Sequence, residues 1–404
     1  MLGVKLSELL GQPEASAYLR AIIRGQRFAN AYLFHGPAGV GKMTGALAFA
    51  SAILCEHGVP ASSNTAPGLF DAPAPAEQSD APANDACGVC AACVKTRTLA
   101  HPDLKFLFPV SGEEKELDNT MAETLAALRA NPFYVFRYEK AASIRLSITR
   151  ELLRELAFKP FESSRRVVVV RDADRMREDQ YSALLKSIEE PGAATVWILT
   201  TSRPTRLPAT IRSRCQKVRF APLAESLVRE QLERELRVPE RESRLLAALA
   251  GGSLARAIEL RDAGDPIELR NKALALLEPA LRGDPGALWQ TVQRYMNFGR
   301  TGRDSLKRMV EFHELWLRDL LRARYGGVEE SLVHFDRAAE IRRQAAGLDA
   351  TEIRRRLMVL EEMLRAIDGN VAADVAMFSG MARVAGARLG EGDWPRHPTG
   401  RWNY

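Results

Sequence analysis

Hydrophobic segments in the first half of the chain predict buried strands that alternate with helices. Three short segments are apolar or β-branched, as in parallel strands covered on both faces: Ala31–His35, Arg166–Arg171 and Thr195–Thr201. Between the last two, Asp179–Glu190 has a helical pattern that a following Pro-Gly pair ends. The order of strand, helix and strand predicts an α/β fold with a parallel sheet.

After Phe220 the strand patterns stop and helical patterns take over. Residues 225–259 have the pattern of short helices broken at a Gly-Gly pair, and Ser305–Arg322 is amphipathic. The run from Ile353 to Ile367 also places apolar side chains on one helical face. We therefore expect an α/β domain over residues 1–220, a small helical lid over 221–264, a helical bundle over 265–388 and a loose tail over 389–404.

Composition predicts an insertion in the first domain and the cellular location of the protein. Residues 58–86 are rich in Ala, Pro, Ser and Asp without periodicity, which predicts a disordered insertion in the first domain. Hydrophobic residues make up 46% of the chain, no apolar stretch is long enough for a membrane span, and the first residues lack a signal-peptide pattern. We expect a cytoplasmic protein without membrane contact, whose net charge of +6 permits but does not require contact with nucleic acid.

A glycine-rich turn lies between the first strand and a helix expected over Thr44–Leu54. Its residues Gly36, Gly39, Gly41 and Lys42 match a Walker A phosphate loop, in which backbone amides and a lysine surround phosphate groups. The alternative is a glycine turn with an incidental lysine. The setting between strand and helix is independent of the motif and favours the phosphate loop.

Two groups that ATP hydrolysis requires are missing. Met43 stands where a Ser or Thr hydroxyl would bind magnesium. Asp172 follows the second strand and could orient a metal, but Ala173 replaces the glutamate that would polarise the attacking water, and Asp174 could substitute only if the strand end bends. The sequence predicts no intrinsic ATP hydrolysis and leaves the binding of ATP or ADP open.

Four of the five cysteines suggest a metal site. Cys87, Cys90 and Cys93 follow one another at intervals that let a turn direct three sulfurs at one ion, and Cys55 ends the helix after the phosphate loop. A closed four-cysteine site for structural Zn²⁺ is the favoured interpretation. Unrelated buried thiols, a catalytic zinc and an iron–sulfur cluster are the alternatives.

An arginine near the end of the α/β domain has an exposed setting. Arg214 follows the third strand, in the segment Ser213-Arg214-Cys215 at the rim of the domain. A rigid, always charged guanidinium could stabilise the charge on the γ-phosphate of ATP bound to a neighbouring subunit. The alternative is a surface salt bridge.

With these motifs, and with His101-Pro102-Asp103, Ala183–Pro191 and Ile211–Cys215, the sequence resembles bacterial clamp-loader AAA+ subunits, most of all their delta-prime members. The resemblance implies a non-hydrolysing stator in a five-membered ring with motor subunits of tau/gamma type and a delta-type subunit. That ring, part of the DNA polymerase III holoenzyme, places a sliding clamp on primed DNA during DNA replication. By the same resemblance the bundle is an oligomerising collar, Arg214 is an arginine finger acting in trans, and the four cysteines hold structural zinc. Contact with the sliding clamp would be indirect.

Two other functions compete with this one. The first is an ATP-hydrolysing clamp-loader motor of tau/gamma type, or another AAA+ ATPase. Against it, Ala255 stands where the motor subunits carry their sensor arginine, with Arg256 one position away. The second is a DNA-binding protein that acts alone, suggested by arginines at 203, 206, 212, 214 and 219.

Overall fold

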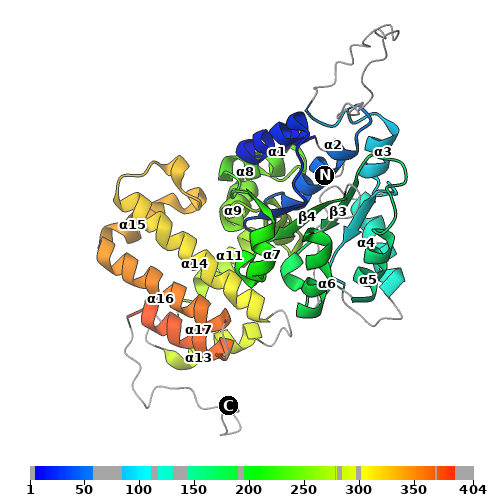
Figure 1. Ribbon diagram of the computed structural model, residues 1–404. Coiled ribbons are helices and arrows are strands. Elements are labelled where there is room, and N and C mark those ends of the chain that lie inside the picture. Colours follow the sequence, from blue (N-terminus) through cyan, green and yellow to red (C-terminus); the bar gives the residue numbers. More distant parts are fainter. Residues whose placement is uncertain are drawn as a thin grey trace, which may run out of the picture. The chain divides into compact units, whose positions relative to one another are not determined.

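The computed structural model describes residues 5–57, 84–110, 117–130, 143–144, 146–189, 195–277, 279, 284–296, 302–368 and 371–386 (Figure 1). The chain divides into two compact units, one of Met1–Val228 with Gly252–Ile258 and the other of Arg229–Gly251 with Glu259–Tyr404. Residues 58–83 of the predicted insertion and the whole predicted tail lie outside the described residues. The division into α/β domain, lid and bundle stays a prediction.

The first unit is built on a five-stranded parallel sheet with the strand order β2-β3-β4-β1-β5. The strands are β1 (Ala31–His35), β2 (Leu104–Leu107), β3 (Arg166–Val170), β4 (Thr195–Thr201) and β5 (Gln216–Arg219). Every residue of β3 and β4 is buried, because helices cover both faces of the central strands.

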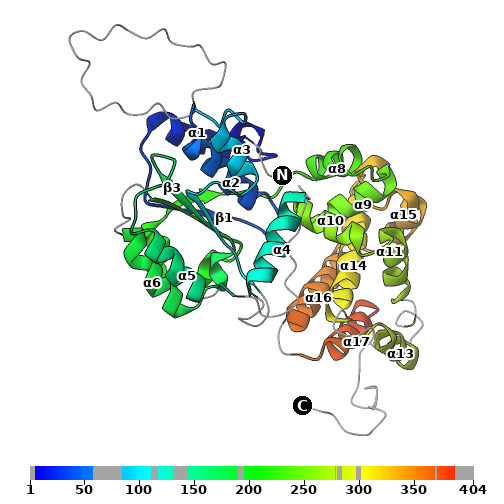
Figure 2. The same ribbon diagram turned by 90° about the vertical axis from the view of Figure 1, so that its right-hand side faces the viewer.

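Two layers of helices enclose this sheet, as Figure 2 shows. Side chains at alternating strand positions enter opposite layers: Tyr32 and Phe34 pack towards one, and Ala31 and Leu33 towards the other. The first layer contains α1 (Pro13–Gly25), α2 (Lys42–Leu54) and α3 (Ala91–Arg97), and the second contains α5 (Leu146–Glu155), α6 (Glu178–Glu189) and α7 (Ala209–Arg214). Further elements are α4 (Leu117–Ala130) and the 3-10 turns η1 (Leu6–Glu8), η3 (Ala173–Arg175) and η4 (Pro204–Arg206).

The described part of the second unit is helical. Its central element is α14 (Gly302–Arg324), which packs against α9, α11, α13, α15, α16 and α17. These are α9 (Glu240–Ala250), α11 (Pro266–Ala275), α13 (Pro285–Met296), α15 (Ala338–Gly347), α16 (Ala350–Asp368) and α17 (Ala373–Val384), with the 3-10 turns η6 (Glu329–Ser331) and η7 (Phe335–Arg337). The helices α8 (Glu225–Arg234) and α10 (Leu254–Asp262) each begin in the first unit and end in the second.

The predicted α/β class and its parallel sheet are confirmed. The strands Ala31–His35 and Thr195–Thr201 have the predicted bounds, β3 ends one residue early, and α2 begins at Lys42 rather than Thr44. The Pro-Gly pair expected to end α6 lies outside the described residues. The strands β2 and β5 are not in the prediction, because each is short and partly exposed. Among the helices that the structure describes, none is long and apolar enough to cross a membrane.

Candidate functional site

The phosphate loop connects β1 to α2, as the motif predicts. Gly36, Gly39 and Gly41 all have positive φ angles, of 151°, 73° and 98°. Residues other than glycine rarely adopt such angles, because their Cβ atom clashes with the backbone. At Gly39 the spacing is also tight, because a Cβ atom there would lie 2.1 Å from the Ser253 hydroxyl. The loop geometry therefore depends on glycine for both backbone conformation and close approach.

Lys42 is bound to its own loop. Its ammonium group donates hydrogen bonds to the carbonyl oxygens of Gly36 (2.8 Å) and Pro37, and to the Ser202 hydroxyl beyond β4 (3.0 Å). Burial of the side chain lowers the pKa of Lys42 to about 8. The sequence interpretation did not include Ser202, whose only signal is a polar residue directly after an apolar strand.

The expected magnesium ligand is replaced by a core residue. Met43 packs against the hydrophobic cluster of the first helix layer, so its side chain contributes to packing. Asp172 follows β3 with a left-handed backbone (φ 46°), and its carboxylate lies 3.3 Å from Arg171 Nε. The position after it, Ala173, is fully buried. The nucleotide site thus keeps Asp172 after β3, but it has neither the hydroxyl after Lys42 nor the glutamate after Asp172.

Asp174, the possible substitute base, is already engaged. Thr201 donates a hydrogen bond to its carboxylate (2.7 Å), and Arg203 donates through Nε (2.8 Å) and forms an ion pair through Nη2 (2.6 Å). The Asp174 side chain is only 2% exposed. Because these partners occupy the carboxylate oxygens, Asp174 is not free to orient an attacking water.

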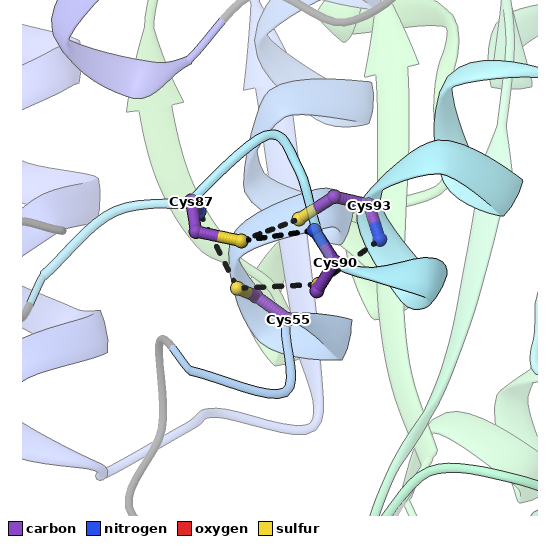
Figure 3. Close-up of side chains that lie close together, drawn as sticks. All are labelled: Cys55, Cys87, Cys90 and Cys93. Atoms are coloured by element: carbon purple, nitrogen blue, oxygen red, sulfur yellow. Dashed lines mark hydrogen bonds between the residues drawn. The ribbon is translucent and has the colours of Figure 1, made fainter. Parts of the chain in front are cut away.

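The four predicted cysteines come together in one cluster (Figure 3). The Sγ atoms of Cys55 and Cys90 are 3.9 Å apart, as are those of Cys87 and Cys93, and all four lie within 4.8 Å of one another. Tetrahedral zinc with Zn–S bonds of about 2.3 Å requires sulfurs about 3.8 Å apart. The geometry fits this ion, and the long insertion after Cys55 does not separate that cysteine from the other three.

The thiols of the cluster differ in pKa. The side-chain hydrogen bond between Cys93 and Cys55 lowers the pKa of Cys55 to about 4, and the same bond together with burial raises the pKa of Cys93. Backbone amides support the sulfurs: Cys87 N donates to Cys55 Sγ (3.4 Å) and Cys90 N to Cys87 Sγ (3.3 Å). Zinc bound by the four sulfurs in their thiolate form would supply a structural crosslink.

Two carboxylates beside the cysteines connect neighbouring elements of the first unit. The Asp85 carboxylate accepts hydrogen bonds from Leu6 N and Ser7 N, both at 2.9 Å, and Glu56 accepts one from Ala92 N (3.1 Å). Residues 84–86, the last three of the predicted insertion, are therefore part of this structure, because Asp85 is fully buried and accepts hydrogen bonds from the first two amides of η1. That part of the predicted disorder is wrong.

Arg214 lies far from the phosphate loop of its own chain. It ends α7, where Nη1 donates to Thr210 O (3.1 Å) and Nε pairs with the Glu189 carboxylate at the end of α6. Because β5 runs parallel to β1 with Gln216 beside Tyr32, Arg214 sits at the edge where the strands begin. The phosphate loop follows the other end of β1, more than about 13 Å away along the strand direction. Arg214 therefore does not complete its own phosphate site.

Comparison with known proteins places these features in a family. The model of the family described as "DNA polymerase III, delta subunit" matches residues 11–67 and 74–224, together just over half of the chain. The chain is 24% identical over 360 residues to DNA polymerase III subunit delta' of Bacillus subtilis, covering 89% of this chain and 92% of the relative.

Two further relatives match shorter stretches. DNA polymerase III subunit delta' of Pseudomonas aeruginosa is 31% identical over 239 residues, covering 58% of this chain and 57% of the relative. DNA polymerase III subunit tau of Bacillus subtilis is 24% identical over 263 residues, covering 64% of this chain but only 37% of the relative. The resemblance inferred from the motifs is confirmed, and the chain belongs to the DNA polymerase III delta subunit family.

Proposed function

We propose that this chain is a delta-prime-like, non-hydrolysing subunit of a bacterial clamp loader. In this role it joins motor subunits of tau/gamma type and a delta-type subunit, and the complex loads a sliding clamp on primed DNA for DNA polymerase III. One observation carries the proposal: the phosphate loop lacks its magnesium ligand and its base, while an exposed arginine stands at the opposite edge of the sheet.

The missing groups argue against hydrolysis by this chain. Magnesium and a base that activates water both act on the transition state, and the loss of either lowers turnover by orders of magnitude. Met43 is used in packing, Ala173 is buried, and Asp174 is held by Arg203. Nucleotide binding is a separate property, since the glycines and Lys42 are present.

Arg214 is suited to act on a neighbouring subunit. Its ion pair with Glu189 is solvent-accessible, with the two side chains 41% and 43% exposed. Exposed pairs of this kind stabilise a fold little, so the guanidinium can exchange the carboxylate for a phosphate group at small cost. We assign Arg214 as the arginine finger that completes an ATP site on a motor subunit.

Ion pairs in the second unit support a rigid stator. Asp336 accepts hydrogen bonds from Arg270 (2.7 Å) and Arg241 (2.8 Å), and Arg244 lies over the Phe335 ring at 4.6 Å. Burial alone would raise the pKa of Asp336, but the two arginines lower it to about 2. These contacts connect α9 to α11 and η7, which is consistent with a rigid role for this part of the second unit.

The competing function is an ATP-hydrolysing motor of tau/gamma type, favoured by the presence of the loop glycines and Lys42 and by the similarity to a tau subunit. Reconstitution separates the two. Motor and delta-type subunits should assemble with this chain and load the clamp, and omission of the chain should abolish loading. Magnesium-dependent turnover by the isolated chain, lost on Lys42→Ala, would instead establish a motor.

A further inference from the structure

The carboxylate that holds Arg214 stands at a position that its own helix does not favour. Glu189 is the last residue of α6, and its side chain forms an ion pair with Nε of Arg214. The carbonyl groups at the end of a helix carry partial negative charge, so an acidic side chain is unfavourable there. Among the described residues, Arg214 is the only charged partner of Glu189. The position of Glu189 therefore suits contact with Arg214 rather than the stability of α6.

The backbones that carry these two side chains are fixed. Ile188 and Ile211 are buried in the same hydrophobic cluster, where α6 and α7 pack side by side (Figure 1). Asn30, the residue before β1, donates hydrogen bonds through Nδ2 to Ile188 O (3.3 Å) and Glu189 O (3.4 Å). At the end of α7, Cys215 is buried and β5 follows directly. The ion pair thus joins the ends of two ordered helices.

This ion pair engages the group with which Arg214 would stabilise a phosphate. Nε is paired with Glu189, and Nη1 donates a hydrogen bond to Thr210 O (3.1 Å). Within the described part of the chain, Nη2 alone among the guanidinium nitrogens has no partner. The carboxylate offsets the charge of the guanidinium and repels an approaching γ-phosphate. Arg214 can therefore give its full charge to a phosphate only after it leaves Glu189.

Exposure to water makes this exchange reversible. Both side chains of the pair are partly exposed, and water weakens the attraction between such groups. A γ-phosphate carries more negative charge than a carboxylate and accepts hydrogen bonds from a guanidinium on several oxygens. A phosphate held close to Arg214 therefore displaces Glu189, whereas a distant phosphate does not.

We propose that Glu189 is a positioning residue that restrains Arg214 and so limits ATP hydrolysis on the neighbouring subunit until clamp and primed DNA are bound. The proposal rests on the proposed function, in which Arg214 serves that neighbouring site. Glu189 does not contact ATP itself. While the contact between the subunits is loose, Glu189 keeps the guanidinium. When the contact closes, the γ-phosphate comes close enough to take Arg214 from Glu189.

The test measures ATP turnover by the reconstituted loader with Glu189→Gln, which removes the charge and keeps the shape of the side chain. Without clamp and DNA, we expect the rate to rise about 2- to 5-fold, the range that the strength of an exposed ion pair allows. With both present, the rate should equal that of the wild type, because the γ-phosphate has then displaced Glu189. In a chain that also carries Arg214→Ala, Glu189→Gln should have no effect. A purely structural defect would not raise the unstimulated rate.

Glu162→Gln is the matched control. Glu162 pairs with Lys95 at 2.7 Å, and the two side chains are 37% and 40% exposed, close to the values for Glu189 and Arg214. Removal of this charge should leave the rates with and without clamp and DNA unchanged. An equal rise of the unstimulated rate with Glu162→Gln would assign the effect to net charge and overturn the proposal.

The remaining outcomes separate this proposal from the proposed function. An unchanged unstimulated rate with Glu189→Gln overturns the restraint, while the proposed function stands if Arg214→Ala lowers the stimulated rate. A lower stimulated rate with Glu189→Gln would mean that Glu189 aligns Arg214 for catalysis, and a rise that persists with Arg214→Ala would mean that Glu189 acts elsewhere. Either result overturns the restraint. If Arg214→Ala changes neither rate, the proposed function fails first and the restraint falls with it.

Discussion

The cysteine cluster and the phosphate loop are two sites of the same unit in opposite conditions. The cluster has a complete set of ligands, with four sulfurs at the spacing that zinc requires and backbone amides directed at them. The phosphate loop has its glycines and lysine but has lost the hydroxyl and the glutamate, and Asp174 is taken by Arg203. Both sites are well packed, so the difference lies in chemistry rather than order.

This difference shows which part of each site the fold depends on. The glycines of the phosphate loop are required by backbone conformation and by the close approach of Ser253, so they persist without catalysis. Hydrolytic groups have no such structural role, and Met43 uses its position for packing. A metal crosslink needs every ligand, because three cysteines would leave an open site.

The largest expected effect comes from breaking the cysteine cluster. Cys90→Ala should abolish stoichiometric metal binding and lower the midpoint of thermal unfolding by about 10 °C or more, since metal binding contributes directly to folding free energy. Metal analysis of the purified protein and calorimetry measure both. Chelation of the wild-type protein should have a similar effect.

Cys215 offers the matched control. It is also buried, but it packs in the other helix layer, outside the cluster. Cys215→Ala should keep the metal and lose only about 1 kcal/mol of stability, as for other small deletions in a core. A metal-free, fully folded wild-type protein would contradict the structural site.

A smaller effect is expected at Lys42 and depends on pH. Its pKa falls from 10.5 to about 8 on folding because the side chain is buried, so between these values the unfolded chain binds more protons. Stability should therefore rise with pH over this interval, by up to about 3 kcal/mol, and this gain is lost as pH falls through 8. Urea unfolding at pH 7.5 and 9.5 should show the gain in wild type and not in Lys42→Met. An equal gain in stability with pH in the two proteins would refute the assignment of this gain to Lys42.

The smallest effect is expected from restoring the missing hydroxyl, which should not restore ATP hydrolysis. Met43→Thr supplies the missing hydroxyl, but Ala173 still provides no base and Asp174 remains bound to Arg203. ATP turnover by the isolated variant should stay at background in a coupled phosphate assay. Magnesium-dependent turnover that disappears in Met43→Thr with Lys42→Ala would mean that the hydroxyl alone had silenced the site.

The sequence predicted features that depend on local spacing. The strands β1 and β4 were readable because nearly all of their residues are apolar or β-branched, and the glycines and cysteines follow fixed intervals. The division into an α/β part and a helical part follows from the same patterns. The edge strand β5 was not predicted, because Val218 is its only buried residue.

Features that depend on distant partners were not predictable. The pairing of Asp174 with Arg203, the hydrogen bonds from η1 to Asp85 and the hydrogen bond from Phe161 N to Asp103 all join residues far apart in the chain or across a turn. Nor does the identity of Phe158 or Phe161 reveal that each is exposed, because apolar residues in short segments usually indicate burial. These contacts can be identified only in the folded structure.

The central claim is that this chain aids hydrolysis at a neighbouring site without performing it. The most direct measurement is the clamp- and DNA-stimulated ATPase rate of the reconstituted loader carrying Arg214→Ala or Lys42→Ala. We predict that Arg214→Ala lowers the rate by at least the share of the one site it serves, since an arginine finger accelerates its site by about 10³-fold or more. Lys42→Ala should leave the rate unchanged. A normal rate with Arg214→Ala and a reduced rate with Lys42→Ala would contradict the account.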